Sequence, residues 1–355
     1  MSDELTYAKA GVDLDQEKIA LKNLWQQIQT TFRFNPHYPP VDIKGHYAGL
    51  VDIGLPDKYL ATTVDGVGTK VLIAEMMEKY DTVGIDCIAM NVNDLICLGA
   101  EPFLFVDYLA IEKMIPSLVE EIVKGLVEGA RQSRVAIIGG ETATMPQVIK
   151  GFKPETGFDL AGMALGIVNK ENIITGEKIK SGDKIIGIAS TGIHSNGFSL
   201  ARKTFFDKAG LTVDSEIDGF GVGSTLLEPT AIYVPEVLEL ISNVEVHGLA
   251  NITGGSFSKL QRLNRSGKLG FELDRLPDPP QIFKTIQRLG NVPLNEMYRT
   301  FNMGVGFCVV VPAELEEKAI KIIKQHKREA TTIGSVSAEA GIVRCKLDSQ
   351  EVVFH

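Results

Sequence analysis

The spacing of apolar side chains along the chain predicts helices that alternate with short strands. Apolar positions at helical spacing, together with helix-starting prolines, predict helices over residues 16–32, 71–80, 83–98, 116–133, 229–241, 279–289 and 312–327. Shorter apolar or β-branched runs predict strands over residues 47–53, 59–64, 103–111, 135–138, 158–168, 184–189, 246–252, 307–311, 331–336, 341–347 and 352–354. Glycine turns follow several of these strands, where a ligand can approach the backbone.

The pattern changes over residues 169–183, which are polar and contain glycine, in contrast to the apolar strands on either side. A chain of 355 residues is long enough for about two domains. We therefore expect a domain boundary in this segment, with one domain over residues 1–169 and a second over residues 170–355.

Composition indicates a folded chain, because 44% of the residues are hydrophobic and 23% are charged. The net charge of −9 argues against a surface dedicated to nucleic acid or to anionic lipid. The acidic start lacks the apolar core of a signal peptide, and no apolar run is long enough to span a bilayer. The cysteines form no CxxC pair and the histidines no metal-binding spacing, so we expect reduced cysteines and a cytoplasmic protein.

One glycine-bearing stretch after the second predicted strand combines groups suited to a metal-chelated polyphosphate. Asp65 stands at the strand end and offers oxygen ligands to a divalent cation. Gly66 and Gly68 let backbone N–H groups approach a ligand, and Thr69 is placed to cap the next helix, whose N-terminus attracts anions. Lys70 adds a positive charge suited to phosphate. The alternative is a strand–turn–helix corner that binds no ligand; the spacing does not fit a Walker A loop.

The predicted helix over residues 83–98 carries polar side chains on one flank. Asp86 and Asn93 lie seven positions apart and share this flank, with Asp94 a little further round. The flank is either a solvated face or an edge that binds metal or phosphate, because short acidic and amide side chains are poor helix formers. Asp107 lies alone in the next apolar strand and needs a partner or a function.

Two later glycine-bearing turns are further candidates for ligand contact. Gly139, Gly140 and Glu141 follow the short strand that we expect to be buried, and they place a carboxylate at its end. Taken alone, this turn is a weak motif.

The loop over residues 191–197 also follows a predicted buried strand and precedes a helix. Ser195 or Asn196 is a natural N-cap for that helix, and the flanking glycines let the chain bend around a ligand. His194 can donate a hydrogen bond to developing negative charge or move a proton, since its reference pKa is about 6.5. The alternative is a loop histidine that bonds only to neighbouring backbone.

An ordered set of strings resembles the aminoimidazole ribonucleotide synthetase family, also called phosphoribosylformylglycinamidine cyclo-ligases. The resemblance extends from Ala10-Gly-Val-Asp13 to the last strands. Its strings are Asp65-Gly-Val-Gly-Thr-Lys70, Asn91-Val-Asn-Asp-Leu95, Gly99-Ala-Glu-Pro102, Gly139-Gly-Glu-Thr-Ala143, Met145-Pro146, Thr191-Gly-Ile-His-Ser-Asn-Gly197, Ile252-Thr-Gly-Gly255 and Phe301-Asn-Met-Gly304. Ser256 departs from the pattern, because family members often have a third glycine at this place.

The resemblance implies an α/β (α+β) fold of two domains: an N-terminal sheet-and-helix domain that binds ATP and dimerises, and a C-terminal α/β sandwich domain. It implies a homodimer whose ligands are ATP, Mg²⁺ and formylglycinamidine ribonucleotide. The implied reaction belongs to de novo purine biosynthesis: the amide oxygen is phosphorylated, a nitrogen attacks the same carbon, and phosphate leaves as the imidazole ring closes.

The same resemblance assigns roles to residues of this chain. It implies that Asp65 and Asp94 bind Mg²⁺ and that His194 and Lys70 are catalytic. The implied nucleotide-binding residues are Asp65, Gly66, Gly68, Thr69, Lys70, Asn93, Asp94, Gly139, Gly140, Glu141, Ser195 and Asn196.

Two other functions fit parts of the pattern. One is another ATP-using member of the same superfamily, similar to formylglycinamidine synthase, selenophosphate synthetase or thiamine-monophosphate kinase. Selenophosphate synthetases usually carry a reactive cysteine near the start, whereas here no cysteine precedes Cys87. The other is a non-catalytic nucleotide-binding subunit.

Overall fold

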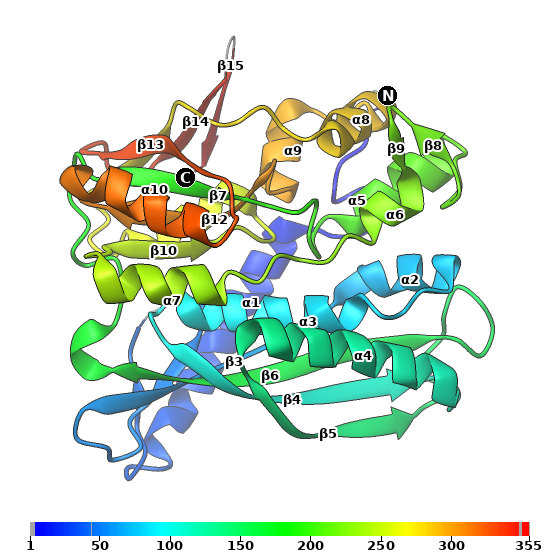
Figure 1. Ribbon diagram of the computed structural model, residues 1–355, viewed down its shortest axis with the longest axis horizontal. Helices are drawn as coiled ribbons and strands as arrows, with labels where there is room; N and C mark the ends of the chain where they lie inside the picture. The colour runs from blue at the N-terminus through cyan, green and yellow to red at the C-terminus, as the bar shows by residue number, and fades with distance from the viewer. Residues whose placement is uncertain (1–3, 44, 348–349, 355) are drawn as a thin grey trace.

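The computed structural model describes residues 4–43, 45–347 and 350–354 and builds them around two large β-sheets, one in each half of the chain (Figure 1). This mixed α/β architecture confirms the predicted fold class. In the described residues, no helix is long and apolar enough to cross a membrane.

The first sheet contains six strands in the order β1-β2-β3-β6-β4-β5. Only β4 and β5 pair in parallel; the other neighbours are antiparallel, and β3 lies beside β6 with Asp65 opposite Gly162. The strands are β1 (Pro40–Val41), β2 (Gly49–Val51), β3 (Lys58–Gly66), β4 (Glu101–Ile111), β5 (Ala136–Thr144) and β6 (Phe158–Asn169).

Helices α3 and α4 cover the face of this sheet that is turned toward the second half of the chain (Figure 1). In α3 every residue except Ile85 and Asp94 is buried. The helices of the first half are α1 (Leu14–Ile28), the 3₁₀ turns η1 (Gln29–Arg33) and η2 (Gly68–Lys70), α2 (Val71–Met77), α3 (Val83–Ile96) and α4 (Pro116–Ser133).

The second sheet contains seven strands in the order β10-β12-β7-β13-β11-β14-β15. The strand β12, which lies inside the sheet between β10 and β7, is buried at every position, as its unbroken apolar sequence predicts. The strands are β7 (Lys184–Ala189), β10 (Gly248–Asn251), β11 (Gly270–Leu273), β12 (Val305–Val311), β13 (Ala330–Ser337), β14 (Val343–Leu347) and β15 (Gln350–Phe354), and a separate hairpin is formed by β8 (Glu216–Ile217) and β9 (Phe220–Gly221).

The helices of the second half surround this sheet, and α7 packs against both α3 and α4 of the first half (Figure 1). One segment, Lys203–Lys208, is a π-helix, here η4. The others are η3 (Lys170–Asn172), α5 (Phe198–Arg202), α6 (Val222–Leu226), α7 (Val234–Asn243), η5 (Ser256–Leu263), α8 (Gln281–Gly290), α9 (Leu294–Thr300), η6 (Ala313–Leu315) and α10 (Glu316–Gln325).

Two predicted elements differ from the structure. The helix expected from Pro229 begins only at Val234, with Pro235 in its first turn, so residues 228–233 form an irregular segment that we call the strap. The strand expected over residues 135–138 is not short and buried. It runs through Gly139, Gly140 and Glu141 as β5, an edge strand whose residues are mostly exposed.

Candidate functional site

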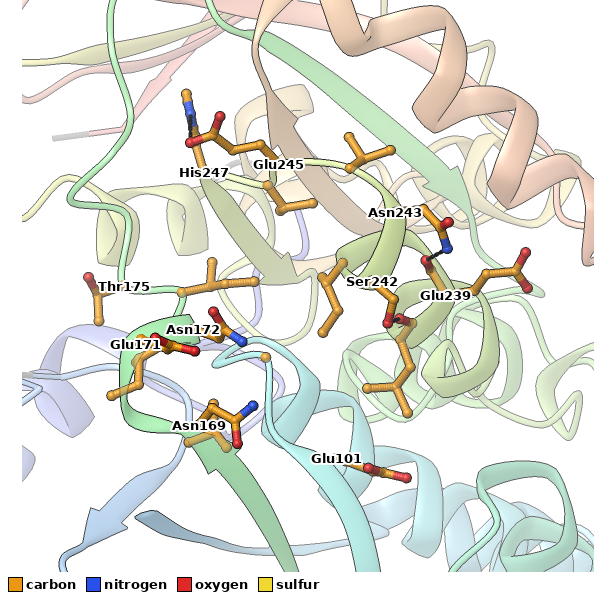
Figure 2. Close-up of a pocket in the computed structure, with 18 of the residues that line it drawn as sticks. Glu101, Asn169, Glu171, Asn172, Thr175, Glu239, Ser242, Asn243, Glu245 and His247 are labelled. Carbon is orange, nitrogen blue, oxygen red and sulfur yellow. Dashed lines mark hydrogen bonds and ion pairs between the residues drawn. The ribbon is translucent and has the colours of Figure 1, made fainter. Parts of the chain in front are cut away.

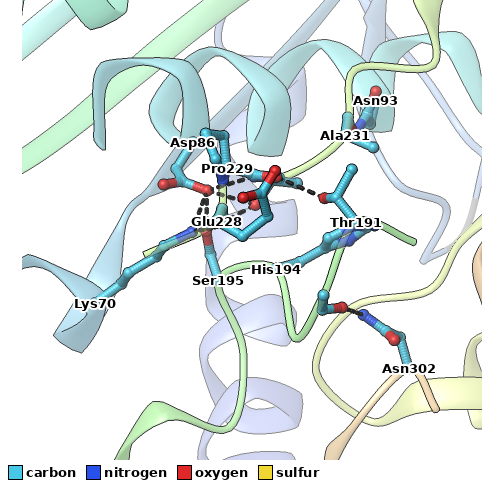
Figure 3. Close-up of polar contacts among 12 residues, drawn as sticks. Lys70, Asp86, Asn93, Thr191, His194, Ser195, Glu228, Pro229, Ala231 and Asn302 are labelled. Atoms are coloured by element: carbon cyan, nitrogen blue, oxygen red, sulfur yellow. Dashed lines mark hydrogen bonds and ion pairs between the residues drawn. The ribbon is translucent and has the colours of Figure 1, made fainter. Parts of the chain in front are cut away.

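The polar flank of α3 is not a solvated face, because it bonds to the second half of the chain (Figure 3). Asp86 is fully buried. Its Oδ1 accepts hydrogen bonds from Lys70 Nζ at 2.9 Å, from Ser195 Oγ at 3.2 Å, and from the Thr230 backbone N–H and Oγ1 at 2.7 and 2.6 Å. One carboxylate oxygen thus joins η2, the 191–197 loop and the strap.

Lys70 is fully buried within this junction. Its Nζ forms the ion pair with Asp86 and donates a second hydrogen bond, of 2.6 Å, to the Glu228 backbone oxygen. Burial lowers the pKa of Lys70, and the charge of Asp86 opposes that shift. In this arrangement the ammonium group neutralises a buried carboxylate, and the expected contact between Lys70 and phosphate stays a prediction.

Asn93, about two helical turns after Asp86 on α3, also bonds to the strap. Its Nδ2 donates to the Ala231 backbone oxygen at 2.8 Å, and its Oδ1 accepts from the Tyr233 backbone N–H at 3.0 Å. Both ends of the amide are occupied in a buried position. The side chain expected to bind nucleotide thus satisfies the backbone of a segment that lies just before α7.

His194 is also buried, with 2% of its surface exposed, in the loop that the sequence marked as catalytic. Its Nε2 accepts a hydrogen bond from the Thr191 backbone N–H at 3.2 Å. Burial, with the charges of Lys70 and Arg328, lowers its pKa to about 3, so the imidazole is neutral near pH 7. The observed bond is the one to neighbouring backbone that the sequence offered as the alternative, and the catalytic role of His194 stays a prediction.

The packing around His194 explains the glycine that faces it. His194 holds a left-handed backbone conformation, with φ of 59°. A Cβ atom on Gly306 would lie 2.5 Å from His194 Cε1 and 2.0 Å from Tyr233 Oη. Any side chain at position 306 would therefore displace the imidazole and the loop that carries it.

Asp65 and Asp94 lie close enough for the charge of Asp65 to raise the pKa of Asp94. Burial is the larger cause and brings the pKa of Asp94 to about 7, although Asn251 Nδ2 donates to its Oδ1 at 2.8 Å. Burial also raises the pKa of Asp65, against the Gly66 N–H and the charge of Lys259. Asp65 and Asp94 are thus two partly exposed carboxylates that lie near each other, in surroundings that solvate negative charge poorly.

Cations and polar groups from the second half of the chain surround this carboxylate pair. The charges of Arg262 and Lys259 lower the pKa of Asp94, which places both cations near it. The guanidinium carbon of Arg262 lies 4.7 Å from the Tyr47 ring centre, and Tyr47 Oη donates to the Lys259 backbone oxygen at 3.3 Å. These residues, together with Asn251, are missing from the sequence-based site.

The nearby glycine turns supplied the only sequence signal for these missed residues. Tyr47 follows a glycine-bearing loop, and Lys259 and Arg262 follow Thr253-Gly-Gly255. The departure at Ser256 made the second of these turns look unlike a ligand site, although η5 still carries two cations toward the carboxylates.

The remaining predicted site residues are spread over the surface and the junction. Gly68 and Thr69 are exposed, and Gly66 is partly exposed. Asn196 has a buried Nδ2 without a hydrogen-bond partner in the described chain. On β5, Glu141 is exposed and makes no side-chain hydrogen bond or ion pair with any described residue, and Gly140 packs on Asp107, whose Oδ1 would be 2.4 Å from a Cβ there.

Neither expected helix cap is present. No side chain caps α2 or η2, so Thr69 does not act as an N-cap. The N-cap of α5 is Gly197, in a left-handed conformation and without a capping side chain, because Ser195 bonds to Asp86 instead.

A large cavity lies elsewhere, between the end of β6 and α7 (Figure 2). It has a volume of about 1050 Å³, and Figure 2 shows Glu101, Glu171, Glu239 and Glu245 around it. None of the predicted site residues lines it. The predicted site residues therefore lie outside this cavity.

Two family models match the chain in sequence order. The AIR synthase related protein N-terminal domain matches residues 45–168, and the AIR synthase related protein C-terminal domain matches residues 180–346. Among curated relatives, the phosphoribosylformylglycinamidine cyclo-ligase of Methanocaldococcus jannaschii is 52% identical over 335 residues, covering 94% of this chain and 92% of the relative.

This chain belongs to the phosphoribosylformylglycinamidine cyclo-ligase family. The cyclo-ligase of Thermococcus kodakarensis is also 52% identical, over 95% of this chain and 97% of its own length. The cyclo-ligase of Pyrococcus horikoshii is 51% identical, over 96% of this chain and 98% of its own length. The family resemblance inferred from the ordered strings is thereby confirmed.

Solved structures of lower identity share the cyclo-ligase fold. A HypE–HypF complex aligns with a TM-score of 0.61 and 19% identity, covering 87% of this chain and 93% of that chain. T. maritima PurL complexed with ADP aligns with a TM-score of 0.58 and 16% identity, covering 91% of this chain and 47% of that chain. At these identities the likeness is one of fold.

Proposed function

We infer that this chain is an ATP-dependent ligase that closes the imidazole ring of formylglycinamidine ribonucleotide to give aminoimidazole ribonucleotide in purine biosynthesis. The observation that carries this inference is the 52% identity to a named cyclo-ligase over 94% of the chain. The fold it shares with PurL structures that hold ADP, ATP or FGAR supports the use of ATP and of a related ribonucleotide.

The chemistry explains why ATP is needed. An amide oxygen is a poor leaving group, whereas phosphate is a good one. Transfer of a phosphoryl group to that oxygen forms the O–P bond and releases ADP; attack by the ring-closing nitrogen then breaks the C–O bond and releases phosphate. The protein must hold nucleotide and substrate in line, so its contribution is positioning and charge.

We propose that Asp65 and Asp94 hold the Mg²⁺ that accompanies ATP. The donor set fits, because hard carboxylate oxygens suit Mg²⁺ and both groups lie where burial disfavours their negative charge. Mg²⁺ would supply charge neutralisation for the phosphates. Since no cluster of three or more acidic, histidine or cysteine side chains occurs among the described residues, nucleotide oxygens and water would complete the coordination.

The exposed backbone of Gly68 and Thr69, next to Asp65, is open to the nucleotide phosphates in this proposal, with Gly66 beside it. Lys259 and Arg262, from the second half of the chain, would attract the negatively charged phosphates. Gly139, Gly140, Glu141, Asn93 and Asn196 remain proposed nucleotide-binding residues on the family resemblance alone.

In this proposal Lys70, His194 and Ser195 do not contact the ligands. They hold in place the loops that do. Lys70 and Ser195 converge on Asp86, and His194 fixes the turn of the 191–197 loop through Thr191. Together they hold the loop after β7 against the loop after β3. We propose that these side chains are positioning residues for the nucleotide and the ribonucleotide.

We propose that the protein forms a homodimer through the sheet face opposite α3 and α4. Support comes from large apolar side chains left exposed on three strands of this sheet, β3, β4 and β5: Val64 at 69%, Phe103 at 41% and Ile138 at 65% exposure. Isolated exposed apolar residues are ordinary, but a patch on one sheet suggests an interface. The four free, buried cysteines support the proposed cytoplasmic location.

The decisive assay mixes the protein with Mg²⁺, ATP and formylglycinamidine ribonucleotide and measures aminoimidazole ribonucleotide by chromatography. We expect one ADP per product molecule and no ADP release when the ribonucleotide is omitted. ADP release without ring closure would instead indicate another ATP-using member of the superfamily. Nucleotide binding with neither product would indicate a non-catalytic subunit.

A further inference from the structure

A second cavity, of about 530 Å³, lies between α2 and η4, and its lining differs from that of the cavity between β6 and α7. Phe152 and Phe206 contribute aromatic walls, and Ser199, Arg202, Lys203 and Asp207 contribute polar groups. Ser199 lies two residues beyond the 191–197 loop, and the neighbouring Phe198 ring centre is 5.7 Å from Lys70 Nζ. The cavity is therefore next to the junction that joins the two halves.

Arg202 is the group in this cavity that lacks a partner. Its Nε is buried and has no hydrogen-bond acceptor in the described chain, and no described carboxylate lies within ion-pair distance. Burial lowers its pKa, while the more distant charges of Asp207 and Glu75 oppose that shift. A guanidinium carries five N–H donors in a planar fork that matches the oxygens of a phosphate or carboxylate.

Hydrogen bonds hold the walls of the cavity around Arg202 in place. Lys203 Nζ donates to the Lys9 backbone oxygen at 2.6 Å, which fixes the N-terminal segment at the rim. Glu75 Oε2 accepts from the Phe152 backbone N–H at 2.6 Å, which fixes one aromatic wall. Arg202 immediately precedes the π-helix η4, and π-helical turns occur frequently at functional sites.

We propose that this cavity binds a phosphomonoester, with Arg202 as the main contact and the aromatic walls against the sugar to which the phosphate is attached. The charge and the donor geometry of Arg202 select a phosphate, and the apolar walls select an organic ester over inorganic phosphate. The phosphate belongs either to the ribonucleotide substrate or to a separate sugar-phosphate effector. The substrate as its source rests on the proposed function, whereas the binding of a phosphomonoester does not.

Titration calorimetry with ribose 5-phosphate, and with ribose as the uncharged control, tests the site directly. We expect wild-type protein to bind ribose 5-phosphate and not ribose, and Arg202→Gln to weaken that affinity by about tenfold or more. Asp207→Asn removes a negative charge from the exposed rim and should strengthen it about twofold to fivefold. Arg131→Gln, at an exposed arginine on α4, is the matched control and should leave the affinity unchanged.

Asp207 is exposed, so we expect Asp207→Asn to fold. This variant tests the proposal even if Arg202→Gln does not fold. The proposal is wrong if wild-type protein binds ribose and ribose 5-phosphate equally or not at all, or if neither substitution changes the affinity. If the variants behave as expected but the wild type forms no aminoimidazole ribonucleotide, the phosphate site stands and the proposed function fails.

Steady-state kinetics then separate the two sources of the phosphate. A substrate phosphate predicts that Arg202→Gln raises KM for formylglycinamidine ribonucleotide and leaves KM for ATP unchanged. A separate effector predicts unchanged KM values and a kcat that responds to added ribose 5-phosphate in the wild type only. Both results support the phosphate site.

Discussion

Ser256 has a left-handed backbone conformation, with φ of 49°, directly after Gly255 with φ of 88°. Its side chain is fully buried, and Oγ has no hydrogen-bond partner in the described chain. A non-glycine residue in this conformation costs about 1–2 kcal/mol. The turn therefore explains physically why a glycine is expected at the position where this chain has serine.

Ser256→Gly should stabilise the protein by about 1 kcal/mol, because relief of the backbone strain and of the unpaired hydroxyl exceeds the greater flexibility of glycine in the unfolded chain. Urea denaturation measures the change. Ser258→Gly is the matched control: Ser258 Oγ donates to the Gly255 backbone oxygen at 2.6 Å, so its loss should destabilise the same turn. A loss of stability in Ser256→Gly would contradict this account.

Asp94 should make the ligand-free protein less stable as pH rises. Its pKa is about 7 in the folded chain and about 3.9 when unfolded, so the folded state holds the extra proton between these values. Stability therefore falls from about pH 4 to about pH 7 and levels off above that. Asp94→Asn keeps an acceptor for Asn251 and should be more stable than wild type by up to about 4 kcal/mol at pH 8, with no such difference at pH 4.

Chemical denaturation of both proteins across this pH range, without Mg²⁺, checks the prediction. Asp52→Asn is a suitable control, because the pKa of the Asp52 carboxyl is lowered by the Gly54 N–H and Lys170 and its effect on stability has the opposite sign. Equal pH profiles for wild type and Asp94→Asn would show that the folded protein does not disfavour this charge.

Residue chemistry could be predicted from the sequence, but residue exposure could not. Asp65 and Asp94 were singled out as carboxylates, and the structure brings their charges together. Lys70 and His194 were singled out for the same kind of reason, yet both are buried. Their burial depends on how the two halves pack: Lys70 Nζ of the first half donates to the Glu228 backbone oxygen of the second, and the charge of Lys70 lowers the pKa of His194 across the same junction. No local pattern encodes that packing.

At the scale of elements, α3 and α4 approach each other through glycine. A Cβ atom on Gly84 would lie 2.2 Å from the Leu126 backbone nitrogen and 2.5 Å from the Gly125 carbonyl carbon. Backbone atoms cannot rotate away as a side chain can. The close contact of these helices thus depends on the missing side chain.

Gly84→Ala should destabilise the protein by about 3 kcal/mol or more, although alanine favours helix by about 1 kcal/mol. The two effects have opposite signs, so a thermal melt distinguishes packing from helix propensity. Gly139→Ala on β5 is the control, because a Cβ there meets no atom within 4 Å. A gain in stability for Gly84→Ala would show that the helices are further apart than described.

The helices with the strongest apolar period were predicted well: α3 and α4 lie within two residues of the expected ranges. The strap and β5 were not. Residues 229–233 read as the start of a helix, but Asp86 and Asn93 bind their backbone groups and hold them irregular. β5 continues through two glycines because β4 pairs with it in parallel as far as Thr144, which is a non-local effect.

At the scale of the whole molecule, the proposed homodimer places Ile138 in an interface. Ile138→Lys should shift the protein to monomer, because a buried lysine without a partner is costly. Light scattering at micromolar concentration measures the mass. Val127→Lys, at a 58% exposed position on α4, is the control and should leave the mass unchanged. A wild-type monomer, or a dimer that survives Ile138→Lys, would contradict the proposed interface.

The four bonds to Asp86 Oδ1 have a consequence for how the chain unfolds. Two family models divide the sequence near residue 170, which would suggest two independent melting units. Yet Asp86 and Asn93 of the first half form hydrogen bonds with Ser195 and with the strap, which belong to the second half. Unfolding the second half would take these partners from Asp86 and Asn93, and unfolding the first half would leave the backbone groups of Thr230, Ala231 and Tyr233 without theirs. Calorimetry should therefore show a single cooperative transition, with neither half folding as a separate fragment.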